Sequence, residues 1–219
     1  MTQRLGLVVL AGGTSRRWGG QDKTAADLLG RPVLVHVLDG AIQALSPDHP
    51  DLVAVVVTDP EHAARKAIRQ RWPELRWTRE VPIRGGPVAG LAAGIQALSG
   101  SCGRVAVLAG DLPFAGPAIA RLALELSTTS TGTDDAVVGF DPSGRRQPLL
   151  AVYRAAPLQD ALDRITAAAP QGTSARRGPA LRDVLDRLTV QESPVSAREA
   201  LDLDTVEQLQ QAARLLQQG

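Results

Sequence analysis

Residues 9–24 read Val-Leu-Ala-Gly-Gly-Thr-Ser-Arg-Arg-Trp-Gly-Gly-Gln-Asp-Lys-Thr, and this stretch joins a predicted buried strand to a glycine-rich basic loop. The apolar run at residues 5–10 supplies the strand, and the loop contains two glycine pairs, Arg17 and Lys23. Glycines let the backbone bend so that several amide N–H groups face one anion. Arginine and lysine add full positive charges. The stretch therefore predicts an α/β protein that holds phosphate at the end of its first strand.

The loop matches neither of the two common phosphate-binding motifs. A P-loop requires glycine directly before the lysine, where this chain has Asp22. The dinucleotide fingerprint requires Gly-x-Gly-x-x-Gly, which Gly12-Gly13-Thr14 does not supply. A basic surface turn without a ligand is the alternative. Lysine usage argues against it, because Lys23 and Lys66 are the only lysines among 24 basic residues, and a compact ammonium in a glycine loop suits a phosphate contact.

Length and composition bound the class of protein. We expect the 219 residues to form a single domain, residues 1–219. Hydrophobic residues make up 44% of the chain and aromatic residues only 3%, so aliphatic side chains build the core. The net charge of +1 gives no general electrostatic reason to bind nucleic acid or an anionic membrane. With Cys102 as the one cysteine, an intramolecular disulfide and a cysteine-rich metal site are excluded.

The start of the chain and its hydropathy predict a location. The residues after Met1 read as a core strand that ends in Gly-Gly, not as a signal peptide. No apolar stretch approaches the roughly 20 residues that span a bilayer. We therefore expect a cytoplasmic protein without a membrane partner.

Apolar strand-like runs alternate with helical patterns along the chain. Strands are expected at residues 5–11, 52–57, 75–80, 105–108, 136–140, 147–153 and 188–192. Helices are expected at residues 32–45, 60–71, 87–98, 117–126, 156–168 and 180–187 and from Thr205 onward. This alternation predicts a three-layer α/β/α sandwich with a Rossmann-like, mostly parallel sheet.

Three predicted strands end in polar residues. The first ends in the glycine-rich loop, the second in Thr58-Asp59 and the fourth in Gly110-Asp111. Ligands of open α/β sheets bind outside the carboxyl ends of the strands, so Asp111 is well placed to bind a metal ion. The alternative is that Asp111 caps the helix at 117–126 or forms a turn.

A second acidic segment, Leu201-Asp202-Leu203-Asp204-Thr205, precedes the last helix. Asp204 or Thr205 could cap that helix. Asp204 could instead join Asp111, because two carboxylates supply the oxygen ligands that Mg²⁺ prefers. The three histidines, His36, His49 and His62, lie in predicted helix or loop without acidic partners, and we expect structural or solvated roles for them.

Taken together, these motifs resemble the signature of the molybdenum cofactor guanylyltransferases (MobA-like), within the nucleotidyltransferase superfamily. The resemblance covers nearly the whole chain and runs in order through residues 10–23, 86–91, 109–113, 146–149 and 202–209. It implies a fold of the nucleotide-diphospho-sugar transferase type. It also implies Mg²⁺-dependent transfer of GMP from GTP to the phosphate of molybdopterin, with release of pyrophosphate, and partners among molybdoenzymes or other proteins of the cofactor pathway.

The resemblance also implies roles for single residues. Arg17, Lys23 and Asp111 would be catalytic, and Asp111 and Asp204 would bind Mg²⁺. Residues 170–179 would lie near the pterin. The expected nucleotide-binding residues are Leu10, Ala11, Gly12, Gly13, Thr14, Ser15, Arg17, Lys23, Gly86, Pro87, Gly90 and Asp111, and the expected acceptor-binding residues are Arg146, Gln147 and Asp202.

The chain departs from the family pattern at four places. Trp18 stands where relatives usually have Met, and Val206 stands where many have Pro. Glu80-Val81 stands where relatives often carry Asp, and Thr58 where some have Asn. The last two leave the base open, so a cytidylyltransferase acting on molybdopterin or another phosphorylated acceptor is an alternative. A non-catalytic nucleotide-binding accessory protein is another. A nucleic-acid-binding module lacks both a basic excess and stacking aromatic residues.

Overall fold

The computed structural model describes residues 4–12, 18, 22–83, 85–128, 133–168 and 178–218. Within these residues, the chain forms one seven-stranded sheet and a small two-stranded hairpin. The sheet order is β5 (Arg76–Thr78), β4 (Val53–Val57), β1 (Arg4–Leu10), β6 (Cys102–Ala109), β8 (Arg146–Arg154), β7 (Ala136–Phe140) and β9 (Val190–Pro194). Strand β8 pairs antiparallel with both of its neighbours, and the other pairings in the sheet are parallel. The mostly parallel sheet is thus confirmed.

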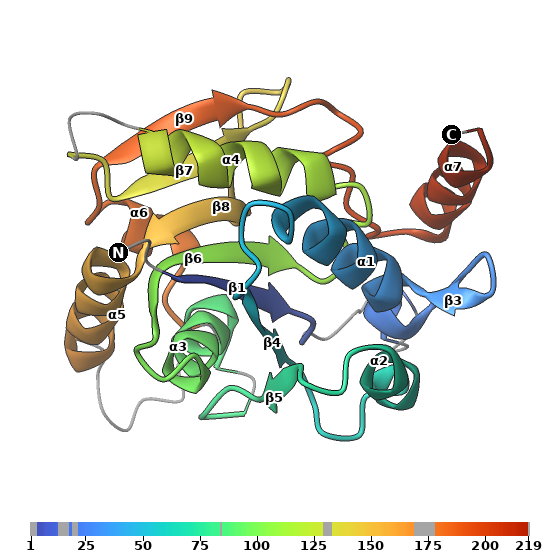
Figure 1. Ribbon diagram of the computed structural model, residues 1–219, viewed down its shortest axis with the longest axis horizontal. Helices are drawn as coiled ribbons and strands as arrows, with labels where there is room; N and C mark the ends of the chain where they lie inside the picture. Colours follow the sequence, from blue (N-terminus) through green and yellow to red (C-terminus); the bar gives the residue numbers. More distant parts are fainter. Residues whose placement is uncertain are drawn as a thin grey trace.

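Helices cover both faces of the sheet. They are α1 (Val33–Leu45), α2 (Arg65–Arg71), α3 (Pro87–Ala97), α4 (Gly116–Thr128), α5 (Ala155–Ala168), α6 (Leu181–Leu185) and α7 (Val206–Gln217). Helices α1 and α4 lie side by side in Figure 1 and share one hydrophobic cluster, whereas α3, α5 and α6 pack into a second. The two clusters lie on opposite faces of the sheet, which confirms the three-layer α/β/α architecture.

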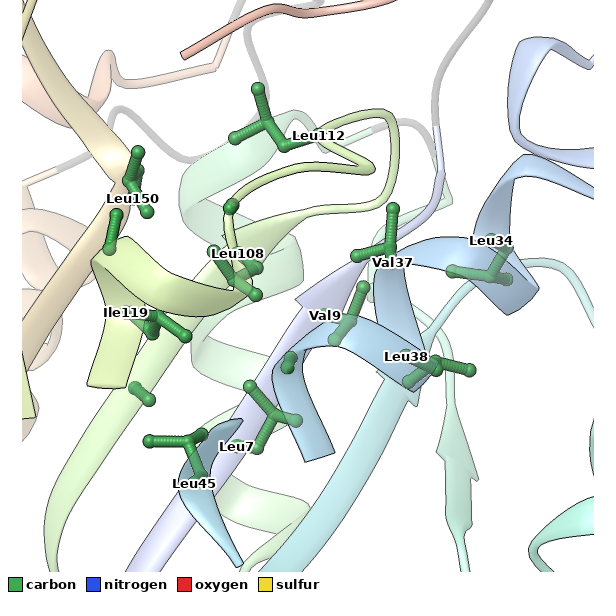
Figure 2. Packing of buried hydrophobic residues seen from close by; sticks show 14 of the residues in the cluster. Leu7, Val9, Leu34, Val37, Leu38, Leu45, Leu108, Leu112, Ile119 and Leu150 are labelled. Atoms are coloured by element: carbon green, nitrogen blue, oxygen red, sulfur yellow. The ribbon is translucent and has the colours of Figure 1, made fainter. Parts of the chain in front are cut away.

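The central strand β1 explains why the chain folds into layers. Leu7 and Val9 point into the cluster with α1 and α4, and Val8 points into the cluster with α3. Successive strand residues face opposite sides of a sheet, so a strand covered on both faces must be apolar throughout. Figure 2 shows Leu7 and Val9 packed against Leu38 and Leu45 of α1.

Helix α3 packs closely on the sheet at one glycine, which gives a stability test. A Cβ atom at Gly94 would overlap Val8 Cγ1, whereas one at Gly90 would make ordinary contacts of 3.6 Å or more. We expect Gly94→Ala to lower the free energy of unfolding by about 1–3 kcal/mol, because β-branched Val8 cannot easily turn away. Gly90→Ala is the matched control on the same helix and should change it by less than about 1 kcal/mol. Urea unfolding of both variants measures the difference, and equal stabilities would contradict this packing.

Two local elements differ from the sequence prediction. The helix expected over residues 60–71 begins only at Arg65. Side-chain acceptors hold the preceding turn, because the Asp59 carboxylate accepts the N–H of Glu61 at 2.9 Å and His62 Nδ1 accepts the N–H of Ala64 at 3.1 Å. Such bonds compete with helix formation.

The second difference is an additional hairpin of strands β2 (Asp27–Leu28) and β3 (Arg31–Pro32). Each of its strands has only two residues, too few for an alternation pattern.

Among the helices of the described residues, none combines the length and the apolar character needed to cross a bilayer.

Candidate active site

Three neighbouring strands end at one edge of the sheet, as the sequence predicted. Past the end of β1, Ala11 donates its N–H to the carbonyl of Val57 at 2.9 Å. Past the end of β6, Gly110 donates its N–H to the carbonyl of Leu10 at 2.8 Å. These two bonds keep the chain segments together beyond the strands. They place the residues after β1, β4 and β6 side by side at the carboxyl edge.

The lysine of the glycine-rich loop lies between two carboxylates at this edge. A short 3-10 helix, η2 (Lys23–Ala25), begins directly after Asp22, whose side chain accepts the N–H of Thr24. Lys23 Nζ forms ion pairs with Asp111 Oδ2 and, at 2.5 Å, with Asp204 Oδ1. Burial alone would lower the pKa of Lys23, but the two carboxylates outweigh it and raise that pKa above its usual value. The ammonium is therefore charged at neutral pH.

Two hydrogen bonds bring the C-terminal segment to this place. Leu203 is buried, and its N–H bonds to the carbonyl of Asp111 at 3.2 Å. Trp18 Nε1 donates to the carbonyl of Leu203 at 3.1 Å. The Thr205 hydroxyl then caps α7 by accepting the N–H of Gln208 at 3.3 Å. Thr205 is therefore the cap, and the Asp204 side chain contacts Lys23 instead.

Asp111 and Asp202 complete the acidic cluster. Asp111 is only 6% exposed, and α4 begins at Gly116, so Asp111 does not cap that helix. The pKa of the Asp202 carboxyl is raised by burial and by the like charges of Asp204 and Asp111, and Lys23 partly opposes this shift. Asp202 also accepts a hydrogen bond from Gln208 Nε2 at 3.3 Å. The structure thus brings Asp202, which was expected to bind the acceptor, close to Lys23, Asp111 and Asp204.

The start of α3, which holds the expected nucleotide-binding residues Gly86, Pro87 and Gly90, lies beside the first strand. Gly86 has φ 87° and ψ −178°, a conformation open essentially to glycine alone, and Pro87 occupies the first helical turn. A Cβ atom at Gly90 would lie 3.6 Å from Leu10 Cδ2. The end of β1 and the first turn of α3 therefore lie side by side.

Glu80 lies close to two of the expected nucleotide-binding residues, a position that the sequence did not indicate. Its Oε2 atom lies 3.3 Å from a Cβ position at Gly12 and 3.9 Å from one at Gly90. The carboxylate therefore lies between the glycine-rich loop and α3. The sequence showed Glu80 only as a departure from the family pattern. A carboxylate shortly before a glycine-rich helix start was the available signal.

Arg146 and Gln147 lie at the same sheet edge but belong to another cluster. Because Leu150 of antiparallel β8 pairs with Leu108 of β6, the beginning of β8 extends past the carboxyl end of β6. Arg146 Nε contacts Glu192 Oε1 at 2.6 Å, and Gln147 Nε2 donates to Asp141 Oδ2 at 2.6 Å. In the contacts of the described residues, neither side chain joins Lys23.

Some predicted site residues lie outside the described residues. They are Gly13, Thr14, Ser15 and Arg17, together with most of the segment 170–179.

The expectation that no histidine has an acidic partner is wrong for His62. Its side chain is wholly buried, and Nε2 lies 3.0 Å from Asp22 Oδ2. His62 lies in the turn before α2, and the residues of this turn were predicted to be helical. His62 therefore belongs to the surroundings of Lys23.

The two carboxylates that share Lys23 also fit a divalent metal ion. Asp111 and Asp204 both point an oxygen at one cationic atom, so a single cation can satisfy both. Among the described residues, no group of three or more His, Cys, Asp or Glu side chains has metal-binding geometry. Two carboxylates suit a Mg²⁺ ion whose coordination shell is completed by water and substrate phosphates. They do not suit an ion that is held by protein ligands alone.

Comparisons with known proteins place the chain among its relatives. The probable molybdenum cofactor guanylyltransferase of Natronomonas pharaonis is 31% identical over 220 residues, which cover 99% of this chain and 100% of that protein. The 2-C-methyl-D-erythritol 4-phosphate cytidylyltransferase of Dehalococcoides mccartyi is 35% identical over 120 residues, which cover 53% of this chain and 50% of that protein.

A solved structure and a family model extend the comparison. Molybdopterin-guanine dinucleotide biosynthesis protein A from Archaeoglobus fulgidus has the same fold, with a TM-score of 0.70, 24% identity, and coverage of 98% of this chain and 100% of that one. The model of the MobA-like NTP transferase domain matches residues 7–190, which is most of the chain and includes the last four residues of β1, Lys23 and Asp111. The chain belongs to the MobA-like NTP transferase family.

Proposed function

We propose that this enzyme, a nucleotidyltransferase, transfers GMP from GTP to the phosphate of molybdopterin and releases pyrophosphate. The observation that carries the proposal is the Lys23 ammonium between Asp111 and Asp204, at the sheet edge where the glycine-rich loop begins. The guanylyltransferase from Natronomonas pharaonis, matched over its whole length, supports the same reaction. The cytoplasmic location and the handover of product to a molybdoenzyme stay predictions.

The chain's own residues would work by positioning and by charge. An acceptor phosphate oxygen attacks the α-phosphorus of GTP, and the bond from that phosphorus to the bridging oxygen of the β-phosphate breaks. Because the nucleophile is already an anion, no serine, cysteine or histidine nucleophile is needed. Lys23 carries three N–H donors, so it can keep a carboxylate partner and still donate to the leaving pyrophosphate. Such preorganised charge is a large source of rate in phosphoryl chemistry.

Asp111 and Asp204 would hold Mg²⁺ in this reaction. When bound, the ion would neutralise charge on the phosphates of GTP. Burial and the like charges of Asp204 and Asp111 already raise the pKa of Asp202, and a divalent cation at this place would oppose that shift as Lys23 does. Arg17, on the glycine-rich loop, is proposed as a further phosphate contact.

Glu80 favours guanine as the base. Guanine presents two N–H donors on its Watson–Crick edge, which one carboxylate can accept together. Cytosine presents two acceptors and one donor there, and acceptors repel a carboxylate. We expect Glu80→Gln to lower kcat/KM for GTP by roughly tenfold to a hundredfold and to reduce the preference of GTP over CTP. Initial rates with both nucleotides measure this, and an unchanged GTP to CTP ratio would remove Glu80 from base recognition.

The proposed function is tested by following labelled nucleotide. Molybdopterin and Mg²⁺ are incubated with α-labelled GTP or CTP, and labelled dinucleotide and pyrophosphate are measured. Transfer from GTP supports the proposal. Transfer from CTP alone supports a cytidylyltransferase, which the similarity to the Dehalococcoides mccartyi enzyme makes the second candidate. Binding of GTP without release of pyrophosphate would indicate a non-catalytic accessory protein.

A further inference from the structure

A buried histidine contacts the two residues that flank the lysine of the proposed phosphate site. His62 belongs to the β4–α2 turn, residues 58–64, and its Nδ1 atom accepts the N–H of Ala64 at 3.1 Å. An accepting Nδ1 carries no proton, so the neutral ring must carry its proton on Nε2. The hydrogen-bond pattern therefore assigns His62 Nε2 as a donor.

This donor points at both residues that flank Lys23. His62 Nε2 lies 2.8 Å from Thr24 Oγ1 and 3.0 Å from Asp22 Oδ2. The Thr24 hydroxyl lies 2.7 Å from Asp22 Oδ1, which also accepts the N–H of Thr24 at 2.9 Å. With His62 as the donor, the hydroxyl gives its one proton to Asp22. Both carboxylate oxygens of Asp22 are thus engaged within this network.

The same turn also holds the other end of the glycine-rich loop. Thr58 Oγ1 donates to the carbonyl of Ala11 at 3.1 Å, directly before Gly12. His62 holds Asp22 and Thr24, directly before and after Lys23. The β4–α2 turn therefore binds the residues at which the loop leaves and re-enters the fold.

We propose that His62 is a positioning residue for phosphate binding, because it holds the side chains on both sides of Lys23 and engages the Asp22 carboxylate. Without this engagement, a carboxylate next in sequence to Lys23 would compete with the phosphates of a nucleotide for the ammonium. His62 itself touches no substrate in this account. The inference rests on the proposed function for the identity of the phosphate ligand.

The test uses two variants in which an amide side chain replaces His62. Each variant keeps a different part of the hydrogen bonding of His62. His62→Asn keeps an acceptor for the N–H of Ala64, as in an Asx turn, but is too short to reach Asp22. His62→Gln extends far enough to donate to Asp22 and Thr24. We expect His62→Asn to weaken the binding of inorganic pyrophosphate with Mg²⁺ by roughly tenfold, and His62→Gln to restore most of it.

A second buried histidine provides the matched control. His36 of α1 is 8% exposed and hydrogen-bonds through Nε2 to the carbonyl of Leu28 at 2.7 Å. His36→Asn should lower thermal stability but leave pyrophosphate binding within about twofold of wild type. Stability loss in both variants, with weaker binding only in His62→Asn, supports the positioning role.

Unchanged pyrophosphate affinity in folded His62→Asn overturns the inference. If that variant does not fold, Thr24→Val decides, because it removes the hydroxyl through which His62 holds the residue after Lys23. Weaker pyrophosphate binding in Thr24→Val then supports the role, and wild-type binding overturns it. Pyrophosphate carries neither base nor acceptor. A wild-type protein that binds it but transfers no GMP would refute the proposed function and leave this comparison intact.

Discussion

Lys23→Met should lower kcat/KM for GTP by about 10³-fold, the larger end of what a lost charge-stabilising donor costs. The reason is that Lys23 carries the positive charge at the centre of the site, where it joins Asp111 and Asp204. Its removal takes away the ammonium that these carboxylates share, and their charge would then repel the phosphates of GTP more strongly. Steady-state rates with GTP, Mg²⁺ and molybdopterin measure the loss.

Two further lysine variants sharpen this prediction. Lys66→Met removes the other lysine of the chain, which is exposed on α2, and should leave kcat/KM unchanged. Lys23→Arg should recover only part of the activity, because a planar guanidinium cannot reproduce the compact ammonium between two carboxylates. A Lys23→Met enzyme with near-normal kcat/KM would show that the phosphates bind elsewhere.

Asp111→Asn should reduce turnover by about 10²-fold or more while the protein stays folded. Asparagine has nearly the same shape as aspartate but lacks the charge that a divalent metal ion needs at this buried position. The backbone carbonyl of Asp111 would still accept the N–H of Leu203, so the C-terminal segment should stay in place. Rates measured across a Mg²⁺ titration, together with thermal unfolding, separate lost chemistry from lost fold.

An aspartate at the opposite end of the sheet is the control for this variant. Asp51 is exposed and lies just before β4 begins, whereas Asp111 follows the end of β6. Asp51→Asn should keep wild-type turnover at every Mg²⁺ concentration. Near-normal turnover of Asp111→Asn at saturating Mg²⁺ would contradict the metal assignment.

The sequence alone predicted those parts of the fold for which one strong local pattern determines the structure. Continuous apolar runs predicted the parallel strands, and strands of one direction necessarily end at one edge. Asp111 and the glycine-rich loop could therefore be placed together in advance. The sequence left the choice between Asp204 and Thr205 open, because both residue types cap helices. In the structure the Thr205 hydroxyl caps the helix, and the Asp204 carboxylate pairs with Lys23.

The rest of the site depends on contacts that no local pattern records. The His62 network joins residues about forty positions apart, through a turn that interrupts an expected helix. Glu80 reaches the site because the chain after β5 runs beside both Gly12 and Gly90. Arg146 and Gln147 reach the predicted edge, yet their side chains pair with Glu192 and Asp141. The strands and the residues at which they end could be inferred from the sequence, but side-chain partners could not.

A crystal structure of the chain with Mg²⁺ and a GTP analogue that resists cleavage would show where the phosphates and the metal ion bind. We expect triphosphate oxygens within hydrogen-bond distance of Lys23 Nζ, with Mg²⁺ contacting Asp111. A nucleotide bound with its phosphates away from Lys23, or a metal ion bound without Asp111, would overturn the assignment of these two residues.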